Sequence, residues 1–250
     1  MRRIVITGMG IISPVGNSVP VFWNNLKAGV CGVEPIRSFD TSDLSVKVAA
    51  QVKDFNPADH GIDAATARKA DLYTLYALAA ARQAMKESNP EMDPERLGVY
   101  VGSGIGGIHT FISECKKYFE SGPNRVSPLF IPTMISNIAA GNIAIAYNAQ
   151  GPCLPVVTAC ATSTHAIGEA FLAIRHGYAD AIIAGGSEAA IVPLAVGGFN
   201  NSRALSRAED PAKASIPFDA QRQGFVMGEG AGIVVLEEYH RAVNRGAVIY

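Results

Sequence analysis

The sequence predicts an α/β protein in which one sheet lies between helices. Short runs rich in β-branched residues alternate along the chain with Ala-rich helical stretches and with loops. These runs are apolar on both faces, as strands covered by helices on two sides must be. The chain has 250 residues, of which 48% are hydrophobic and 17% charged, so it can bury a sizeable core as one compact unit.

Five runs have the composition of buried strands. They cover residues 3–9 (RIVITGM), 97–102 (LGVYVG), 154–159 (LPVVTA), 181–185 (AIIAG) and 232–237 (GIVVLE). Three helices are predicted between these strands. They cover residues 64–87, 133–147 and 162–176. Residues 120–132, with three prolines, and the polar residues 204–223 are predicted to be loops.

Composition and charge exclude several classes of function. Lys and Arg total 21 and Asp and Glu total 22, so the chain lacks the basic excess of nucleic-acid-binding proteins. No apolar run reaches the roughly 20 residues that span a bilayer, so no membrane insertion is expected. The four cysteines form no Cys-x-x-Cys pair and no secretory leader is present, so a reduced, cytoplasmic protein is expected.

Two glycine patterns point to other functions only weakly. The pattern G-x-G-x-x-G at 102–107 follows a predicted strand, but a Pro-rich loop follows where a dinucleotide site requires a second strand ending in an acidic residue. The run GGSEA at 185–189 is related to the nucleophile elbow of serine hydrolases. Pro193 and the paired glycines after it argue against the helix that such an elbow requires.

The strongest local signal is Cys160, which stands where the predicted strand 154–159 runs into a predicted helix. A thiol at a helix N-terminus faces the positive end of the helix dipole, which favours the nucleophilic thiolate. Cys160 is therefore the candidate nucleophile, and a buried, inert cysteine is the alternative. His165 lies on a different face of the helix and is not a convincing base. Together with Cys153 these residues lack the spacing and number of a closed zinc site, so no metal is expected.

Seven segments, taken in order, resemble the β-ketoacyl-acyl carrier protein synthases of the elongating type, closest to synthase II, which have a thiolase-like fold. The segments are RIVITGMGIISPVGN at 3–17, GSGIGG at 102–107, SPLFIP at 127–132, VTACATSTHAIGEA at 157–170, ADAIIAGGSEA at 179–189, GGFNNSRALS at 197–206 and PFDAQRQGFVMGEGAGIVVLEE at 217–238.

The resemblance implies a decarboxylating Claisen condensation of fatty acid biosynthesis. An acyl group passes from acyl carrier protein to the cysteine that Cys160 matches, and is then joined to malonyl-acyl carrier protein with loss of CO2. In this family the backbone N–H of the nucleophile forms half of the oxyanion hole. No cofactor and no metal are implied, because the thioester supplies the driving force and the cysteine supplies the covalent step.

The resemblance also assigns binding residues. Ile105 and Phe199 match positions that line the acyl tunnel. Phe130 and Ile131 match a stretch that reaches in from the partner subunit of a homodimer. Basic positions that meet the acidic carrier protein, through which phosphopantetheine delivers the acyl and malonyl groups, are matched by Arg68, Lys69, Arg125 and Arg203. The sequence departs from the family at Asn124, a position that is often basic, and at Gln223, which interrupts the usual R-D-G-F.

Residues 1–250 correspond to the first of the family's two α/β halves. The resemblance implies a five-stranded mixed sheet, in the order 3-2-1-4-5 counted along the chain, with dimer contacts through residues 154–159. The second half, with two catalytic histidines and a supporting lysine, is expected to lie outside this chain, which alone is competent at most for the thiol step. It would pack on the apolar face that this half exposes.

Four alternatives stay open at this point. The chain could be a ketosynthase of a polyketide pathway, or a non-catalytic partner of the chain-length-factor type, although such factors typically lack the nucleophilic cysteine. A thiolase or a starter-type synthase that uses coenzyme A thioesters is disfavoured by the elongating-type motifs. The fourth alternative is a module that binds carrier protein without chemistry.

Overall fold

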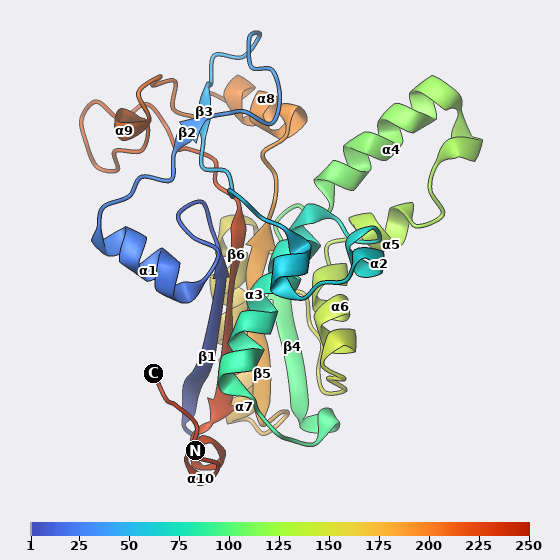
Figure 1. Cartoon of the computed structure of the whole chain (residues 1–250), viewed down its shortest axis with the longest axis vertical. Helices are drawn as coiled ribbons and strands as arrows, with labels where there is room; N and C mark the ends of the chain where they lie inside the picture. Colours follow the sequence, from blue (N-terminus) through green and yellow to red (C-terminus); the bar gives the residue numbers. More distant parts are fainter. Residues whose placement is uncertain (1) are drawn as a thin grey trace.

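A four-stranded mixed sheet forms the centre of the computed structural model, which describes residues 2–250 (Figure 1). Its strands lie in the order β1 (Ile4–Ile12), β6 (Gly230–Glu238), β5 (Ala181–Glu188) and β4 (Leu97–Gly102). Strands β4 and β5 are parallel, whereas β6 runs antiparallel to both of its neighbours. The predicted α/β class, with a mixed sheet between helices, is confirmed.

The prediction of a fifth strand at residues 154–159 is wrong. Residues 154–159 run beside β4 but form no strand, and the residue just before them, Cys153, forms only an isolated parallel bridge with Val99. Pro152 and Pro155 have no N–H to give to a ladder, so regular pairing cannot continue along this edge.

The expected strand order is also wrong. Strand β1 lies at the edge of the sheet instead of at its centre, because β6 inserts between β1 and β5 and pairs with both. The burial of both faces of β6 explains why it lies inside the sheet and not at its edge. Val235 and Leu236 are both buried although they point to opposite faces, so this strand needs neighbours on both sides and helices above and below.

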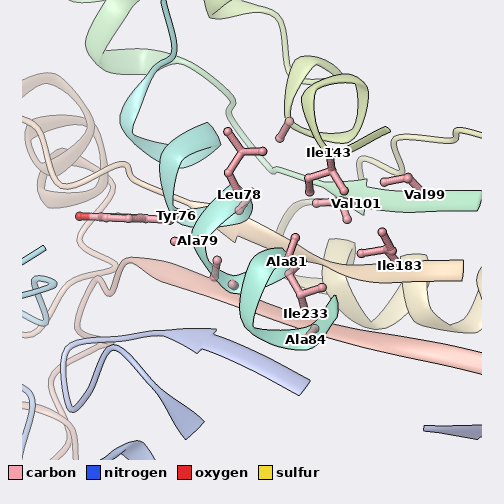
Figure 2. Close-up of a cluster of buried hydrophobic side chains, with 14 of the residues drawn as sticks. Tyr76, Leu78, Ala79, Ala81, Ala84, Val99, Val101, Ile143, Ile183 and Ile233 are labelled. Carbon is pink, nitrogen blue, oxygen red and sulfur yellow. The ribbon is translucent and has the colours of Figure 1, made fainter. Parts of the chain in front are cut away.

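Helices cover both faces of the sheet (Figure 1). The helices α3 (Leu72–Ser88) and α6 (Ile138–Ala146) pack on one face, and α7 (Thr162–Arg175) packs on the other. Side chains alternate between the faces along each strand, as the pleat requires. Figure 2 shows the α3 face, to which the strands contribute Val99, Val101, Ile183 and Ile233. The α7 face receives Tyr100, Ile182, Ala184 and Leu236.

Helix α3 lies unusually close to β1 because both elements have small residues where they meet. A Cβ added at Gly8 or Gly10 would collide with the carbonyl oxygen of Ala84 or Ala80. The backbone of β1 therefore touches the backbone of α3 directly at Ala80 and Ala84.

Two of the predicted helices are interrupted. The predicted helix 64–87 divides into α2 (Ala64–Ala67) and α3, because buried Asp71 stands before α3 in an extended conformation. The predicted helix 133–147 divides into α5 (Phe130–Met134) and α6. The break falls at Ile135, which is extended and accepts the hydroxyl of Tyr73 on its carbonyl oxygen at 2.7 Å.

Helix α7 confirms the prediction for residues 162–176 to within one residue. Helix α8 (Pro193–Asn201) forms although Pro193 and the glycines argued against it, because proline occupies the first helical position, where its missing N–H costs nothing. The predicted loop at 204–223 is largely irregular and contains only the single turn of α9 (Pro211–Ala214).

The remaining elements surround this core. They are α1 (Val19–Lys27), β2 (Glu34–Pro35), β3 (Val48–Ala49), η1 (Pro57–His60), η2 (Pro94–Arg96), α4 (Ile108–Ser121), η3 (Pro123–Arg125), η4 (Ala159–Ala161) and α10 (Tyr239–Asn244). Helix α4 projects from the body as an arm, and the chain returns along it to α5 (Figure 1). Among residues 2–250, no helix combines the length and the apolar character that crossing a membrane requires.

Candidate active site

A cavity of about 770 Å³ opens at the carboxyl ends of β4 and β5. Its wall contains three residues that the sequence analysis singled out, Cys160, Ile105 and Phe199. The wall is completed mainly by small and apolar residues, among them Ile11, Ile12, Ala190, Phe225 and Met227. Such a lining suits an apolar ligand that is oriented by a few polar groups.

Cys160 lies at the centre of a sharp bend. It belongs to the single 3₁₀ turn η4, which follows the irregular segment 154–158 and leads directly into α7. The residue before it, Ala159, has a φ of +48°, in the left-handed region that non-glycine residues rarely adopt. Backbone strain of this kind persists only where the surroundings impose it, and it is concentrated at functional sites.

Two glycines allow the bend to touch the sheet. A Cβ at Gly102, the last residue of β4, would collide with the carbonyl oxygen of Val156 and with the methyl group of Thr162. A Cβ at Gly186 in β5 would collide with the hydroxyl of Ser163. The chain on both sides of Cys160 therefore lies directly on the ends of two strands, which fixes the height of the thiol above the sheet.

A buried side chain closes the bend. The hydroxyl oxygen of Thr162 accepts the backbone N–H of Thr158 at 2.9 Å, and Thr162 is buried. This bond spans Ala159 and Cys160, so it holds the two ends of the strained segment together.

Glu188, at the end of β5, is a site residue that the sequence analysis missed. Its carboxylate accepts the hydroxyl of Ser103 at 3.0 Å and the backbone N–H groups of Gly104 and Ile105 at 2.9 and 3.2 Å. Burial raises the pKa of Glu188, and these hydrogen bonds partly oppose that shift. A carboxylate that ends an otherwise apolar strand beside a glycine-rich loop was the available signal.

The serine-hydrolase interpretation of residues 185–189 does not fit the geometry. Ser187 lies within β5, is buried, and donates its hydroxyl to the carbonyl oxygens of Tyr73 and Gly230 at 2.7 and 3.2 Å. His165 is exposed on α7, where its Nε2 lies 3.5 Å from a carboxylate oxygen of Glu169. Ser187 lies in the cavity wall, but its hydroxyl is bonded to backbone carbonyls, and His165 does not line the cavity.

The four apolar candidates divide into two pairs. Ile105 and Phe199 lie at the cavity, with 44% and 39% of their surface exposed, and Phe199 contacts Phe225 edge to face. Phe130 and Ile131 lie on α5, outside the cavity wall, and Ile131 is 56% exposed. The role of Phe130 and Ile131 in a partner subunit stays a prediction.

The four basic candidates are all exposed. Arg68 and Lys69 follow α2, and the carbonyl oxygen of Lys69 accepts the hydroxyl of Thr133 on α5 at 3.3 Å. Arg125 lies in η3 at the far end of the α4 arm, and Arg203 follows α8. Their side chains form no ion pair within residues 2–250, so all four are available to an acidic partner.

Within the same described range, no three His, Cys, Asp or Glu residues are grouped so that they could hold a metal ion. The four cysteines are free thiols.

Comparisons with known proteins agree with this geometry. The family model of the beta-ketoacyl synthase N-terminal domain matches residues 1–242. A 3-oxoacyl-[acyl-carrier-protein] synthase 2 from Staphylococcus aureus is 48% identical over 252 residues, which cover 100% of this chain and 61% of that protein. The chain therefore spans about three fifths of the length of this relative.

Solved structures of ketosynthases are also similar to this chain. A beta-ketoacyl synthase from Burkholderia phymatum matches with a TM-score of 0.89 and 33% identity, over 100% of this chain and 62% of that one. A ketosynthase in complex with its type II polyketide acyl-carrier protein matches with a TM-score of 0.86 and 33% identity, over 100% of this chain and 61% of that one.

The bond that closes the bend makes a testable prediction. Thr162→Val keeps the shape of the side chain but leaves the N–H of Thr158 without its acceptor, so it should lower the free energy of unfolding in urea by about 1–2 kcal/mol. It should also change the rate at which iodoacetamide modifies Cys160 relative to Cys31 in the same molecule. Thr164→Val, at an exposed position on the same helix, is the control. Equal effects of the two variants would contradict the role of Thr162.

Proposed function

Because the chain belongs to the beta-ketoacyl synthase family by its N-terminal domain, we propose that it carries the acyl-transfer site of a 3-oxoacyl-acyl carrier protein synthase of fatty acid biosynthesis. The observation that carries this proposal is the strained bend that holds Cys160 in the wall of an apolar cavity. Neither feature is needed for a structural cysteine.

In the proposed step, the thiolate of Cys160 attacks the carbonyl carbon of an acyl thioester on the phosphopantetheine arm of acyl carrier protein. A bond forms between the sulfur of Cys160 and the carbonyl carbon, and the bond to the sulfur of phosphopantetheine breaks. The departing thiolate takes up a proton. The backbone N–H of Cys160 is the proposed donor to the oxyanion, and the acyl chain is proposed to lie against Ile105 and Phe199.

The condensation with malonyl-acyl carrier protein, with loss of CO2, is proposed for a complete synthase. The relatives extend well beyond the region that this chain covers, which supports its assignment as the N-terminal portion of a longer synthase. We therefore assign to the present residues only the transfer of the acyl group to Cys160.

Acyl carrier protein is the proposed partner, with Arg68, Lys69, Arg125 and Arg203 as its contacts. Their exposure and their freedom from ion pairs within the described chain support this role, and a carrier protein is bound to one of the related ketosynthases.

A homodimer is proposed along the edge of β4, where Leu154 and Val157 are 44% and 51% exposed beside an incompletely paired strand. The free cysteines suit a reducing cytoplasm.

The alternatives are less well supported. The polyketide ketosynthase with its carrier protein shares 33% identity, compared with 48% for the fatty acid synthase relative. A non-catalytic partner or a simple binding module would not need a strained bend that presents a cysteine to a cavity.

The proposed function makes a prediction for Cys160. Incubation with an acyl-acyl carrier protein should add the mass of the acyl group to the peptide that contains Cys160, as measured by mass spectrometry. Cys160→Ala should abolish the adduct, because no other thiol lies in the cavity wall. Cys31→Ala, which removes an exposed thiol elsewhere, should leave it intact. No adduct in a folded sample, or one on another cysteine, would contradict the proposal.

The second prediction concerns the basic residues. The double variant Arg68→Glu and Lys69→Glu should raise the carrier-protein concentration for half-maximal acylation about tenfold at low salt. The difference should shrink as salt is added, because exposed charges are screened. Acyl pantetheine, which lacks the carrier protein, should react equally with native and variant chains. The double variant Lys27→Glu and Lys86→Glu, at exposed positions on α1 and α3, changes the net charge equally and is the matched control, and an equal loss in it would show that only net charge matters.

A further inference from the structure

The loop of residues 103–107 connects β4 to α4 and brings Ile105 to the cavity. Three of its five residues are glycines, so its own side chains supply little to hold it in place. Ser103 provides one internal contact, in which its hydroxyl oxygen accepts the N–H of Gly106 at 2.9 Å. The other contacts that hold the loop come from distant parts of the chain.

Glu188 holds the first part of the loop. One carboxylate oxygen accepts the hydroxyl of Ser103, and the other accepts the N–H groups of both Gly104 and Ile105. A Cβ at Gly104 would lie 2.8 Å from that second oxygen, so a larger residue there would force the carboxylate to shift. Glu188 forms no ion pair among residues 2–250, and the three hydrogen bonds between its carboxylate and distant residues all go to this loop.

Asp71 holds the other end. It is 3% exposed, and one of its carboxylate oxygens accepts the N–H of Thr110, in the first turn of α4, at 2.7 Å. The N–H of Gly107 is bound by the carbonyl oxygen of Met134 at 2.9 Å, and a Cβ at Gly107 would lie 3.2 Å from Asp71. Asp71 therefore anchors the point where the loop becomes a helix.

We propose that Glu188 and Asp71 are positioning residues that clamp the loop 103–107 at its two ends and thereby determine which acyl chain lengths reach Cys160. The inference rests on the proposed function, because it takes the cavity beside Ile105 as the place of an acyl chain. Charge-assisted hydrogen bonds to backbone N–H groups are among the strongest that a buried carboxylate can form. Removing them releases the backbone that carries Ile105, whereas the bend at Cys160 keeps its own contacts.

The two carboxylates act on separate amides, which gives a readout that needs no substrate. Glu188→Ala should speed the hydrogen exchange of the amides of Gly104 and Ile105 by about tenfold or more, and Asp71→Ala should do so for the amide of Thr110. Glu188→Gln should exchange nearly as the native chain does, because its carbonyl oxygen can still accept both N–H groups while its amide donates to Ser103. Asp93→Asn, another carboxylate that accepts a backbone N–H, is the control in a distant surface turn.

Chain-length selection is tested with N-alkyl maleimides of increasing alkyl length, which add to the thiol of Cys160 without any carrier protein. Peptide mapping separates Cys160 from Cys31, the internal reference. In Glu188→Ala, the ratio of rates for short and long maleimides at Cys160 should change about tenfold, since small displacements of a lining residue alter reactivity strongly. Ser103→Ala, which keeps the carboxylate, should change this ratio in the same direction, and it serves if Glu188→Ala does not fold.

An unchanged ratio in both variants would overturn the proposal, as would an equal change for every alkyl length, which indicates general distortion of the site. Loss of protection in Glu188→Gln as large as in Glu188→Ala would also overturn it, because hydrogen bonding would then not be the cause. Failure of the native chain to accept an acyl group from carrier protein would instead count against the proposed function, while the maleimide ratios would still decide the role of the clamp.

Discussion

The position of Cys160 depends on one steric constraint, the direct contact of the chain around it with two glycines of the sheet. At Gly102 and Gly186 the strands have no side chains, so Val156, Thr162 and Ser163 touch strand backbone. The chain contacts the ends of the strands and then turns directly into α7. It makes this turn at Ala159, which has a left-handed φ. The thiol is thereby presented to the cavity from a strained but well-supported turn.

The part of the cavity wall next to the bend is held in place by polar groups and not by apolar packing. Glu188 binds the loop that carries Ile105, and Ser187 beside it binds the first turn of α3 through the carbonyl oxygen of Tyr73. Neighbouring residues of β5 thus support two separate elements around the cavity. In a buried setting such bonds stabilise strongly when they are complete and cost much when one partner is removed. Hydrogen bonds of buried polar side chains therefore hold the elements that surround the apolar cavity.

Much of the site could be predicted from the sequence because local patterns determine it. A buried run followed by a cysteine and a helical stripe correctly placed Cys160 before α7, and the family motifs placed Ile105 and Phe199 at the same cavity. Apolar runs identified the four strands of the sheet, because β4 and β5 are buried on both faces and the edge strand β1 keeps its other face half-buried.

What could not be predicted depends on partners distant in sequence. The place of β1 at the sheet edge is decided by the pairing of β6, which comes more than 200 residues later. The break before α3 depends on Asp71 binding the N–H of Thr110 on another helix. Glu188 was passed over because its partners lie 83 to 85 residues earlier. Residues 154–159 have strand-like composition, and Pro155 within them prevents regular pairing.

The most direct test of this account joins the glycine contact to the chemistry of the thiol. Gly186→Ala places a methyl group against Ser163 and should displace the bend, whereas Gly141→Ala on α6 adds one where there is room. The rate of the proposed acyl transfer from acyl carrier protein to Cys160 should fall about a hundredfold in the first variant, since displacement of a reacting group by 1 Å can cost that much. It should stay unchanged in the second. Native rates in a folded Gly186→Ala chain would contradict the claim that this contact positions the nucleophile.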